Sequence, residues 1–193
     1  MPFATGIAHP RKKPVNWNPF KKKQQEPELD PLRDLTLSGL KPGYVLDYDL
    51  KTWQVAAQHY YDFEGDHVDE WELSCSDGVL YLEREDDDGV SWSLSEKIPI
   101  SEIDGDLRGH TREEEDPPDS LTCRGVEYEG ESSAVGQFFK NGEPPGQEFI
   151  AWEYLDASGK RTLTVEQWDD DEFDASVGEI VEEYQFSNIL PSG

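Results

Sequence analysis

Apolar and polar residues alternate with a period of two along most of the chain beyond residue 43. In the clearest run, Val90, Trp92 and Leu94 alternate with serines at positions 91, 93 and 95. Such a pattern is typical of a β-strand with one buried face and one face in water. Runs of this kind predict strands at residues 44–49, 52–63, 67–75, 79–85, 90–96, 124–130, 133–140, 147–156, 161–168 and 179–187.

The segments between these runs have the composition of hairpin turns. Glycine and asparagine reach the positive φ angles that tight turns require. They occur in Glu64-Gly65-Asp66, Asp77-Gly78, Asp88-Gly89, Asn141-Gly142 and Ser158-Gly159. About ten short strands joined by such turns predict an all-β fold, either an antiparallel barrel or a sandwich.

The two halves of the chain resemble each other. Tyr60 matches Phe139 at an offset of 79 residues, Trp71-Glu72-Leu73 matches Trp152-Glu153-Tyr154 at 81, and Glu83 matches Glu166 at 83. Because the offset grows in steps of two, each side chain keeps its face of the sheet. We therefore expect one β-rich domain over residues 31–193 that contains two related β-meander units, at 35–103 and 122–190, and an acidic linker at 104–121.

The first 30 residues lack this periodicity. They contain five prolines, which predicts a flexible, disordered leader. Asp30-Pro31 then has the residue types of a helix start, so a short helix over the leucines at 32, 35 and 40 is expected at one end of the fold.

Charge separates the leader from the rest of the chain. The 193 residues include 43 acidic and 17 basic residues, for a net charge of −26. Residues 1–25 hold six of the basic residues and no acidic one, so the remainder has a net charge of −32. Carboxylates over most of this acidic body would repel the phosphates of a nucleic acid, which excludes direct nucleic-acid binding by the body.

The leader is the most specific chemical feature of the sequence. Two basic triplets flank aromatic residues, a composition that suits contact with an anionic surface. The residues concerned are Arg11, Lys12, Lys13, Trp17, Phe20, Lys21, Lys22 and Lys23. Such a tail makes a weak, reversible contact with a membrane, and it could instead bind RNA or fold back on the acidic body.

Catalysis would require carboxylates in a defined pair. A glycosidase uses one acid and one base on either side of the scissile bond, and the repeat relates Glu72 to Glu153 and Glu83 to Glu166. Glu72 and Glu153 directly follow tryptophans, so alternation predicts that both face water. We therefore expect no catalytic residue, with a glycosidase-type hydrolase as the alternative.

No metal or cofactor site is predicted either. The run at 84–89 lacks the ligand spacing of a calcium loop. The carboxylate clusters at 113–116 and 169–172 could attract Ca²⁺ or Mg²⁺ weakly, and they are interpreted as solvated loop charge. His59, His67 and Asp69 are not at a spacing typical of metal ligands. If Phe63 pairs with His67, the hairpin would place His59 opposite Trp71 as a packing residue.

The location follows from what the sequence lacks. No run approaches 18 consecutive apolar residues, and the first residues do not have the pattern of a signal peptide. Cys75 and Cys123 form no CxxC pair. We expect a cytoplasmic protein with two reduced thiols.

Six short motifs in the body are core and turn residues. They are Leu40-Lys41-Pro42-Gly43, Trp53-Gln54-Val55, Trp71-Glu72-Leu73, Trp92-Ser93-Leu94, Thr162-Leu163-Thr164-Val165-Glu166-Gln167-Trp168 and Ala175-Ser176-Val177-Gly178. Together they resemble a bacterial family known as domain of unknown function 4178. The family has no established activity, so the resemblance implies no catalytic residue. Its members are often encoded near membrane-stress proteins, which implies an accessory role at the cytoplasmic membrane.

These features predict a non-catalytic, cytosolic accessory protein that binds an unknown protein partner. Its basic leader would place it at the periphery of the inner membrane. Two alternatives stay open: the carboxylate-based hydrolase, and an acidic mimic of nucleic acid that occupies a basic groove on a partner.

Overall fold

The computed structural model describes residues 35–86 and 89–191, and the structural statements below refer to these residues. Its strands are β1 (Val45–Tyr48), β2 (Lys51–Phe63), β3 (Asp66–Cys75), β4 (Gly78–Asp86), β5 (Val90–Ile98), β6 (Ser120–Cys123), β7 (Val126–Phe139), β8 (Gln147–Asp156), β9 (Arg161–Asp169), β10 (Glu172–Val181) and β11 (Ser187–Leu190). Its helices are α1 (Leu107–Glu114) and the short 3-10 helices η1 (Leu37–Gly39), η2 (Ile100–Glu102), η3 (Lys140–Gly142) and η4 (Glu183–Gln185).

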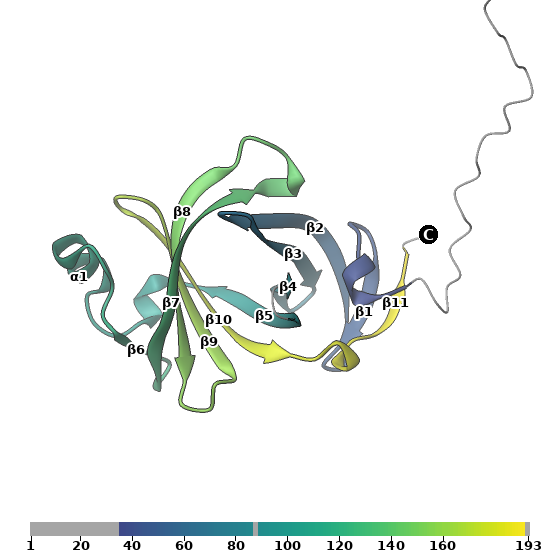
Figure 1. Ribbon diagram of the computed structural model, residues 1–193. Helices are drawn as coiled ribbons and strands as arrows, with labels where there is room; N and C mark the ends of the chain where they lie inside the picture. Colours follow the sequence, from purple (N-terminus) through teal and green to yellow (C-terminus); the bar gives the residue numbers. More distant parts are fainter. Residues whose placement is uncertain (1–34, 87–88, 192–193) are drawn as a thin grey trace, which may run out of the picture.

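The strands belong to one antiparallel sheet, in the order β11-β1-β2-β3-β4-β5-β10-β9-β8-β7-β6. A further pairing between β2 and β7 closes the strands from β2 round to β7 into a ring (Figure 1). Strands β1 and β11 lie outside the ring at one end of the molecule, and β6 and α1 lie at the other. The predicted all-β, antiparallel fold is confirmed.

The ring has an approximate twofold symmetry that follows the sequence repeat. Each half contributes four consecutive strands, and the halves meet where β2 pairs with β7 and where β5 pairs with β10. In the β2–β7 pairing, Tyr60 lies opposite Phe139, two residues that the repeat makes equivalent. Trp71 on β3 and Trp152 on β8 are likewise buried at equivalent positions. The two related β-meander units predicted from the offsets are therefore present.

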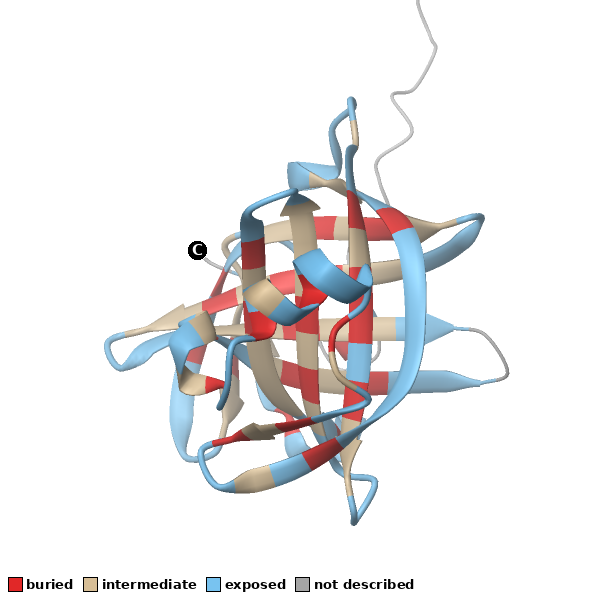
Figure 2. Ribbon diagram, turned by 90° about the vertical axis from the view of Figure 1, so that its left-hand side faces the viewer, coloured by how far each residue is buried: buried red, intermediate tan, exposed pale blue. Residues whose placement is uncertain are grey.

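Apolar side chains form a separate cluster on each half. The cluster around Trp71 includes residues of η1 and β1, and the cluster around Trp152 includes residues of α1 and β6. The indole N–H of Trp71 donates to the carbonyl oxygen of Leu40 at 3.1 Å, which fixes the segment after η1 to its cluster. Figure 2 shows buried residues along the middle of the strands and exposed residues at the turns. Because both tryptophans point outward, the opposite face of these strands lines the inside of the ring.

The segment 104–121, predicted to be a linker, contains α1. Asp106 accepts a hydrogen bond from the backbone N–H of Gly109 at 3.0 Å and so caps the first turn. Leu107 and Thr111, four residues apart, are the buried side chains of the helix. A helix with one short buried stripe inside an acidic segment gives too weak a periodicity to be recognised.

Other strand predictions were wrong at the edges of the sheet. The two strands predicted at 124–130 and 133–140 are one strand, β7, with a bulge between Gly130 and Ser132. Strands β6 and β11 and the first part of β10 were not predicted, because a four-residue strand shows little alternation. The helix expected over residues 32–40 is, within the described residues, only η1.

The β2–β3 hairpin corrects the predicted register by one residue. Phe63 pairs with Asp66, and a bulge in β2 shifts the register again nearer its start. His59 therefore lies opposite Glu70 and not opposite Trp71. A shift of one residue moves a side chain to the other face of a sheet, so His59 lies on the inner face of the ring.

Gly178 on β10 lies where a side chain has no room. A Cβ atom at this position would lie 2.7 Å from the carbonyl oxygen of Leu94 and 2.9 Å from the Cβ of Ser95. Because the backbone of β5 cannot move aside cheaply, we predict that Gly178→Ala lowers the free energy of unfolding by about 1–3 kcal/mol. Urea unfolding measures this loss. Ser176→Ala on the same face of β10 should cost less than about 1 kcal/mol, and an equal loss in both variants would contradict the prediction.

Candidate functional site

Three glutamates face one another inside the ring. Glu70 on β3 lies directly opposite Glu83 on β4, and the charge of Glu166 on β9 acts on both from the other half of the ring. Glu70 is only 3% exposed, and the other two are partly buried. Since the repeat relates Glu83 to Glu166, the approximate twofold symmetry explains why these two converge.

Hydroxyl groups donate to two of these carboxylates. The Tyr61 hydroxyl on β2 donates to Oε2 of Glu70 at 2.8 Å, and the Ser93 hydroxyl on β5 donates to Oε2 of Glu83 at 3.1 Å. Each donor stabilises a negative charge that would otherwise be costly to bury. The cluster is therefore satisfied by neutral groups from β2 and β5.

One lysine acts on the same cluster. Lys97 on β5 forms an ion pair with Asp174 on β10 at 2.9 Å. Its positive charge also favours the ionised forms of Glu70 and Glu166. A single cation cannot balance this number of carboxylates, so negative charge inside the ring is in excess.

Burial raises the pKa of all three glutamates, because loss of water disfavours the charged form. Burial, together with the charges of Glu70 and Glu166, raises the pKa of Glu83 to about 8. Burial raises the pKa of Glu70 to about 7 and that of Glu166 above its ordinary value. The buried indole N–H of Trp168 opposes the shift at Glu166, although its geometry falls short of a hydrogen bond. The cluster therefore holds protons at neutral pH.

His59 makes a second buried contact on the inner face, next to the β2–β7 pairing. Its Nδ1 accepts a hydrogen bond from the backbone N–H of Asn141 in η3 at 2.9 Å. The ring proton therefore lies on Nε2, which is 4.0 Å from Oε2 of Glu72. Burial lowers the pKa of His59, Glu72 acts in the opposite direction, and Lys140 and Lys97 lower it further. Neutral His59 thus links β2 to the segment that follows β7.

The hydrolase alternative rests on two carboxylate pairs, Glu72 with Glu153 and Glu83 with Glu166, which lie in different environments. Glu153 is exposed, as predicted, but Glu72 is partly buried beside His59 and does not simply face water. Glu83 and Glu166 do converge. Two surface pockets in the described part of the chain, one beside α1 on β7 and β8 and one at residues 104–122, are not lined by these four residues. A glycosidase needs substrate access to both carboxyl groups, so the convergence alone does not support catalysis.

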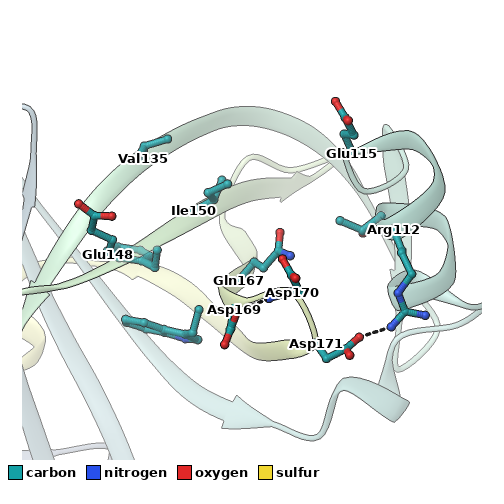
Figure 3. A pocket seen from close by; sticks show the side chains of 12 residues that line it. Arg112, Glu115, Val135, Glu148, Ile150, Gln167, Asp169, Asp170 and Asp171 are labelled. Atoms are coloured by element: carbon teal, nitrogen blue, oxygen red, sulfur yellow. Dashed lines mark hydrogen bonds and ion pairs between the residues drawn. The ribbon is translucent and has the colours of Figure 1, made fainter.

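The larger of these cavities is a pocket of about 740 Å³ between α1, β7, β8 and the turn that joins β9 to β10 (Figure 3). Part of its lining is apolar. Val135 on β7 and its register partner Ile150 on β8 are lining residues. The rings of Phe149 and Trp168, whose centroids lie 4.7 Å apart, belong instead to the cluster around Tyr61 on the inner face of the ring. Val135 is 61% exposed. The pocket therefore offers apolar surface that a ligand can cover.

Carboxylates surround this apolar surface. The acidic residues in the lining, all of them exposed, are Glu115, Glu148, Asp169, Asp170 and Asp171. Arg112 on α1 is the basic residue in the lining, and Figure 3 shows it paired with Asp171. The pocket is thus strongly negative, which favours a cationic ligand with an apolar group.

Sequence patterns did not reveal this pocket. The acidic clusters at 113–116 and 169–172 are far apart in the chain and were interpreted as separate solvated loops. The fold brings Glu115 from the first and Asp169, Asp170 and Asp171 from the second to the same pocket. Glu70 was missed as well, since only the ring topology shows that its face is enclosed.

The leader residues predicted to contact an anionic surface, Arg11, Lys12, Lys13, Trp17, Phe20, Lys21, Lys22 and Lys23, lie outside the described residues. That contact stays a prediction.

In the part of the chain that the structure describes, no group of three or more His, Cys, Asp or Glu residues is arranged to hold a metal ion. Cys75 and Cys123 are free thiols. None of the helices in the described ranges is long and apolar enough to cross a membrane.

The fold and the pocket define an all-β ring protein with a cation-attracting surface site. Comparison with known proteins gives its family: the family described as domain of unknown function (DUF4178) matches residues 41–183. The chain belongs to this family, as its motifs indicated. It is also 27% identical over 169 residues to an uncharacterized protein of Aquifex aeolicus (strain VF5), a match that covers 88% of this chain and 93% of that protein. No solved structure matches the chain.

The glutamate cluster predicts a specific dependence of stability on pH. The pKa values of Glu70 and Glu83 are about 7 and about 8 in the folded state against 4.5 ordinarily. The folded protein therefore retains protons that the unfolded chain releases, and its stability falls as the pH rises from about 4.5 to 8. Glu83→Gln should raise the free energy of unfolding at pH 8 by on the order of 1–3 kcal/mol and change it little at pH 5. Urea unfolding at both pH values tests this.

Glu129→Gln is the matched control, because Glu129 is exposed on β7. It should change stability by less than about 0.5 kcal/mol at both pH values. A loss of stability in Glu83→Gln at pH 8 would show that the ionised carboxylate is favourable inside the ring, contrary to the predicted sign.

The His59 contact predicts the opposite trend. His59→Phe removes the acceptor of the Asn141 N–H and should lower the free energy of unfolding at pH 7.5 by about 1–3 kcal/mol. At pH 5 the difference from wild type should shrink, because protonation of Nδ1 already removes the acceptor there. His67→Phe, at an exposed position, serves as control. A constant effect of His59→Phe across this range would contradict the assigned role of Nδ1.

Proposed function

We propose that this protein is a non-catalytic interaction protein that binds a basic segment of a partner protein in the pocket beside α1. The observation that supports this proposal is the combination of exposed apolar surface, chiefly Val135, with five surrounding carboxylates. Each feature on its own is ordinary for a soluble surface, but together they form a site that one kind of ligand satisfies.

The two parts of the pocket have different roles in such binding. Covering apolar side chains supplies affinity at about 25 cal/mol per Å² buried. The carboxylates attract and orient a cationic segment, and they accelerate its association at low salt more than they increase its final affinity. A lysine- or arginine-rich segment with one large apolar side chain meets both requirements.

The alternatives have less support. A hydrolase would use Glu83 and Glu166, which do not line the pocket. The nucleic-acid mimic and the contact of the leader with the inner membrane stay predictions from the sequence. An accessory role beside the cytoplasmic membrane is compatible with the proposal, because the pocket and the leader are different parts of the chain.

A defined peptide tests the proposal. The probe is a fluorescein-labelled peptide with six lysines and two tryptophans, and its binding to the full chain is measured by fluorescence anisotropy. Glu148→Gln combined with Asp170→Asn should weaken binding about three- to tenfold, as expected for the loss of two exposed charge contacts. Val135→Ser should weaken it as well, because the apolar contact is lost.

The matched control is Glu127→Gln combined with Glu129→Gln, which removes the same charge from exposed positions on β7 outside the pocket. This control should bind the probe within a factor of two of wild type. Equal weakening in the pocket variant and the control variant would show attraction by net charge alone and would contradict a defined site. A probe in which serines replace the tryptophans should bind more weakly than the original probe.

A further inference from the structure

Strand β7 has an open edge between two of its neighbours. On the side away from β8, residues 126–129 of β7 pair with β6, and residues 137–139 pair with β2. Among the described residues, no strand pairs with residues 131–135 on this side, although β8 pairs with them on the other. We call residues 131–135 of β7 the open edge.

The backbone of the open edge is accessible. All of its residues are exposed, and Ser132, Ser133 and Ala134 have small side chains that let another chain approach closely. Every second residue of a strand directs its N–H and C=O to the same edge, so about two or three residues here have backbone groups without a partner strand in the described chain. Proteins usually protect such an edge with charges, proline, bulges or a covering segment. Here a bulge and Glu131 protect only the end next to β6.

The neighbouring strands limit the length of chain that fits. At one end, the backbone N–H of Gly130 donates to the carbonyl oxygen of Asp119 at 2.8 Å. At the other end, Gln137 pairs with Asp62 on β2. The seven positions from Gly130 to Gln137 span about 24 Å in an extended strand. The open edge therefore admits about five residues of an extended chain.

A second copy of the chain does not fit this opening through β7. In that copy, β6 and β2 pair along the same edge of β7. If the two β7 strands paired with each other, these neighbours would collide with β6 and β2 of the first copy. Repulsion between two chains of net charge −26 also disfavours the other strands of a second copy. The occupant is therefore a short segment of a different protein.

A strand added at the open edge gains one apolar contact. Trp152 on β8 points to the outer face of the ring, so Ile150, two residues before it, points to the same face. Val135 is the register partner of Ile150. A side chain opposite Val135 in the added strand therefore lies beside Val135, which is 61% exposed. An apolar side chain there covers this exposed surface.

The other side chains of the added strand meet carboxylates. The exposed acidic residues on β7 and β8 beside the open edge are Glu129, Glu131, Glu148 and Glu153. Glu153 lies opposite Ser132, near the end next to β6. Glu148 lies opposite Gln137, at the end next to β2. Lysine or arginine side chains in the added strand match this charge.

We propose that the open edge of β7 binds an extended, basic segment of a partner protein as an additional strand, about five residues long and with one large apolar side chain. This inference rests on the proposed function, because it states how the basic segment is held. Main-chain hydrogen bonds to β7 supply affinity, while Val135 and the carboxylates select the side chains. The added strand fills the interval between β6 and β2.

The first test removes the main-chain donors of the lysine–tryptophan probe. A second probe of the same sequence carries N-methyl groups on its backbone amides and keeps every side chain and charge. Because strand pairing needs the N–H groups, this probe should bind the full chain at least about tenfold more weakly. Equal affinity of the two probes, with weakening in Glu148→Gln/Asp170→Asn, would overturn the added strand and leave the proposed function standing. Binding of neither probe would overturn both.

The second test locates the added strand on β7. Amide hydrogen exchange of the full chain is followed by NMR with and without saturating unmodified probe. Exchange should slow at least about fivefold at alternate residues within 131–135, since every second N–H points to the open edge. Strand β11 is the control, because it pairs only with β1 in the described chain, and its exchange should stay within a factor of about two.

Two results of the exchange experiment would overturn the inference. Unchanged exchange at residues 131–135 with the probe bound, or equal slowing at β11, would show that the probe does not add a strand at this edge. Protection of residues 131–135 that rises with protein concentration in the absence of probe would place a second copy at the open edge.

Discussion

The pairing of β2 with β7 is the contact on which the rest of the structure depends. Only three register pairs form it, from Tyr60↔Phe139 to Asp62↔Gln137, and the rings of Tyr60 and Phe139 stack 4.4 Å apart across it. Without it, the two halves would form one open sheet, joined through the pairing of β5 with β10. With it, the faces opposite the apolar clusters around Trp71 and Trp152 enclose a shared interior, and carboxylates that would face water face one another.

The duplication explains why this interior is acidic. Each half buries its apolar residues on the outer face, under η1 and β1 in one half and under α1 and β6 in the other. The face turned inward carries the glutamate cluster and, next to the β2–β7 pairing, a third apolar cluster around Tyr61 and Phe149. The approximate twofold symmetry places Glu83 opposite its counterpart Glu166. Burial raises the pKa of both carboxyl groups, so their ionised forms are destabilised inside the ring.

Much of the fold could be predicted from local patterns, because alternation and the repeat both act over short distances. Trp71 and Trp152 were correctly placed as buried and equivalent. What could not be predicted depended on register or closure: a two-residue turn moved His59 to the other face, and closure partly enclosed Glu72. The pocket could not be predicted from the sequence for the same reason, since Glu115 and Asp170 come to line one pocket only in the folded chain.

Ring closure is the central claim, and nuclear Overhauser effects across β2 and β7 test it most directly. In the closed ring, backbone protons of Tyr61 and Phe138 lie close together, because these residues are register partners. Cross-peaks between them should appear alongside those between Tyr61 and Val68, its partner on β3. Cross-peaks to Val68 without any to Phe138 would show an open sheet and contradict the enclosed carboxylate interior.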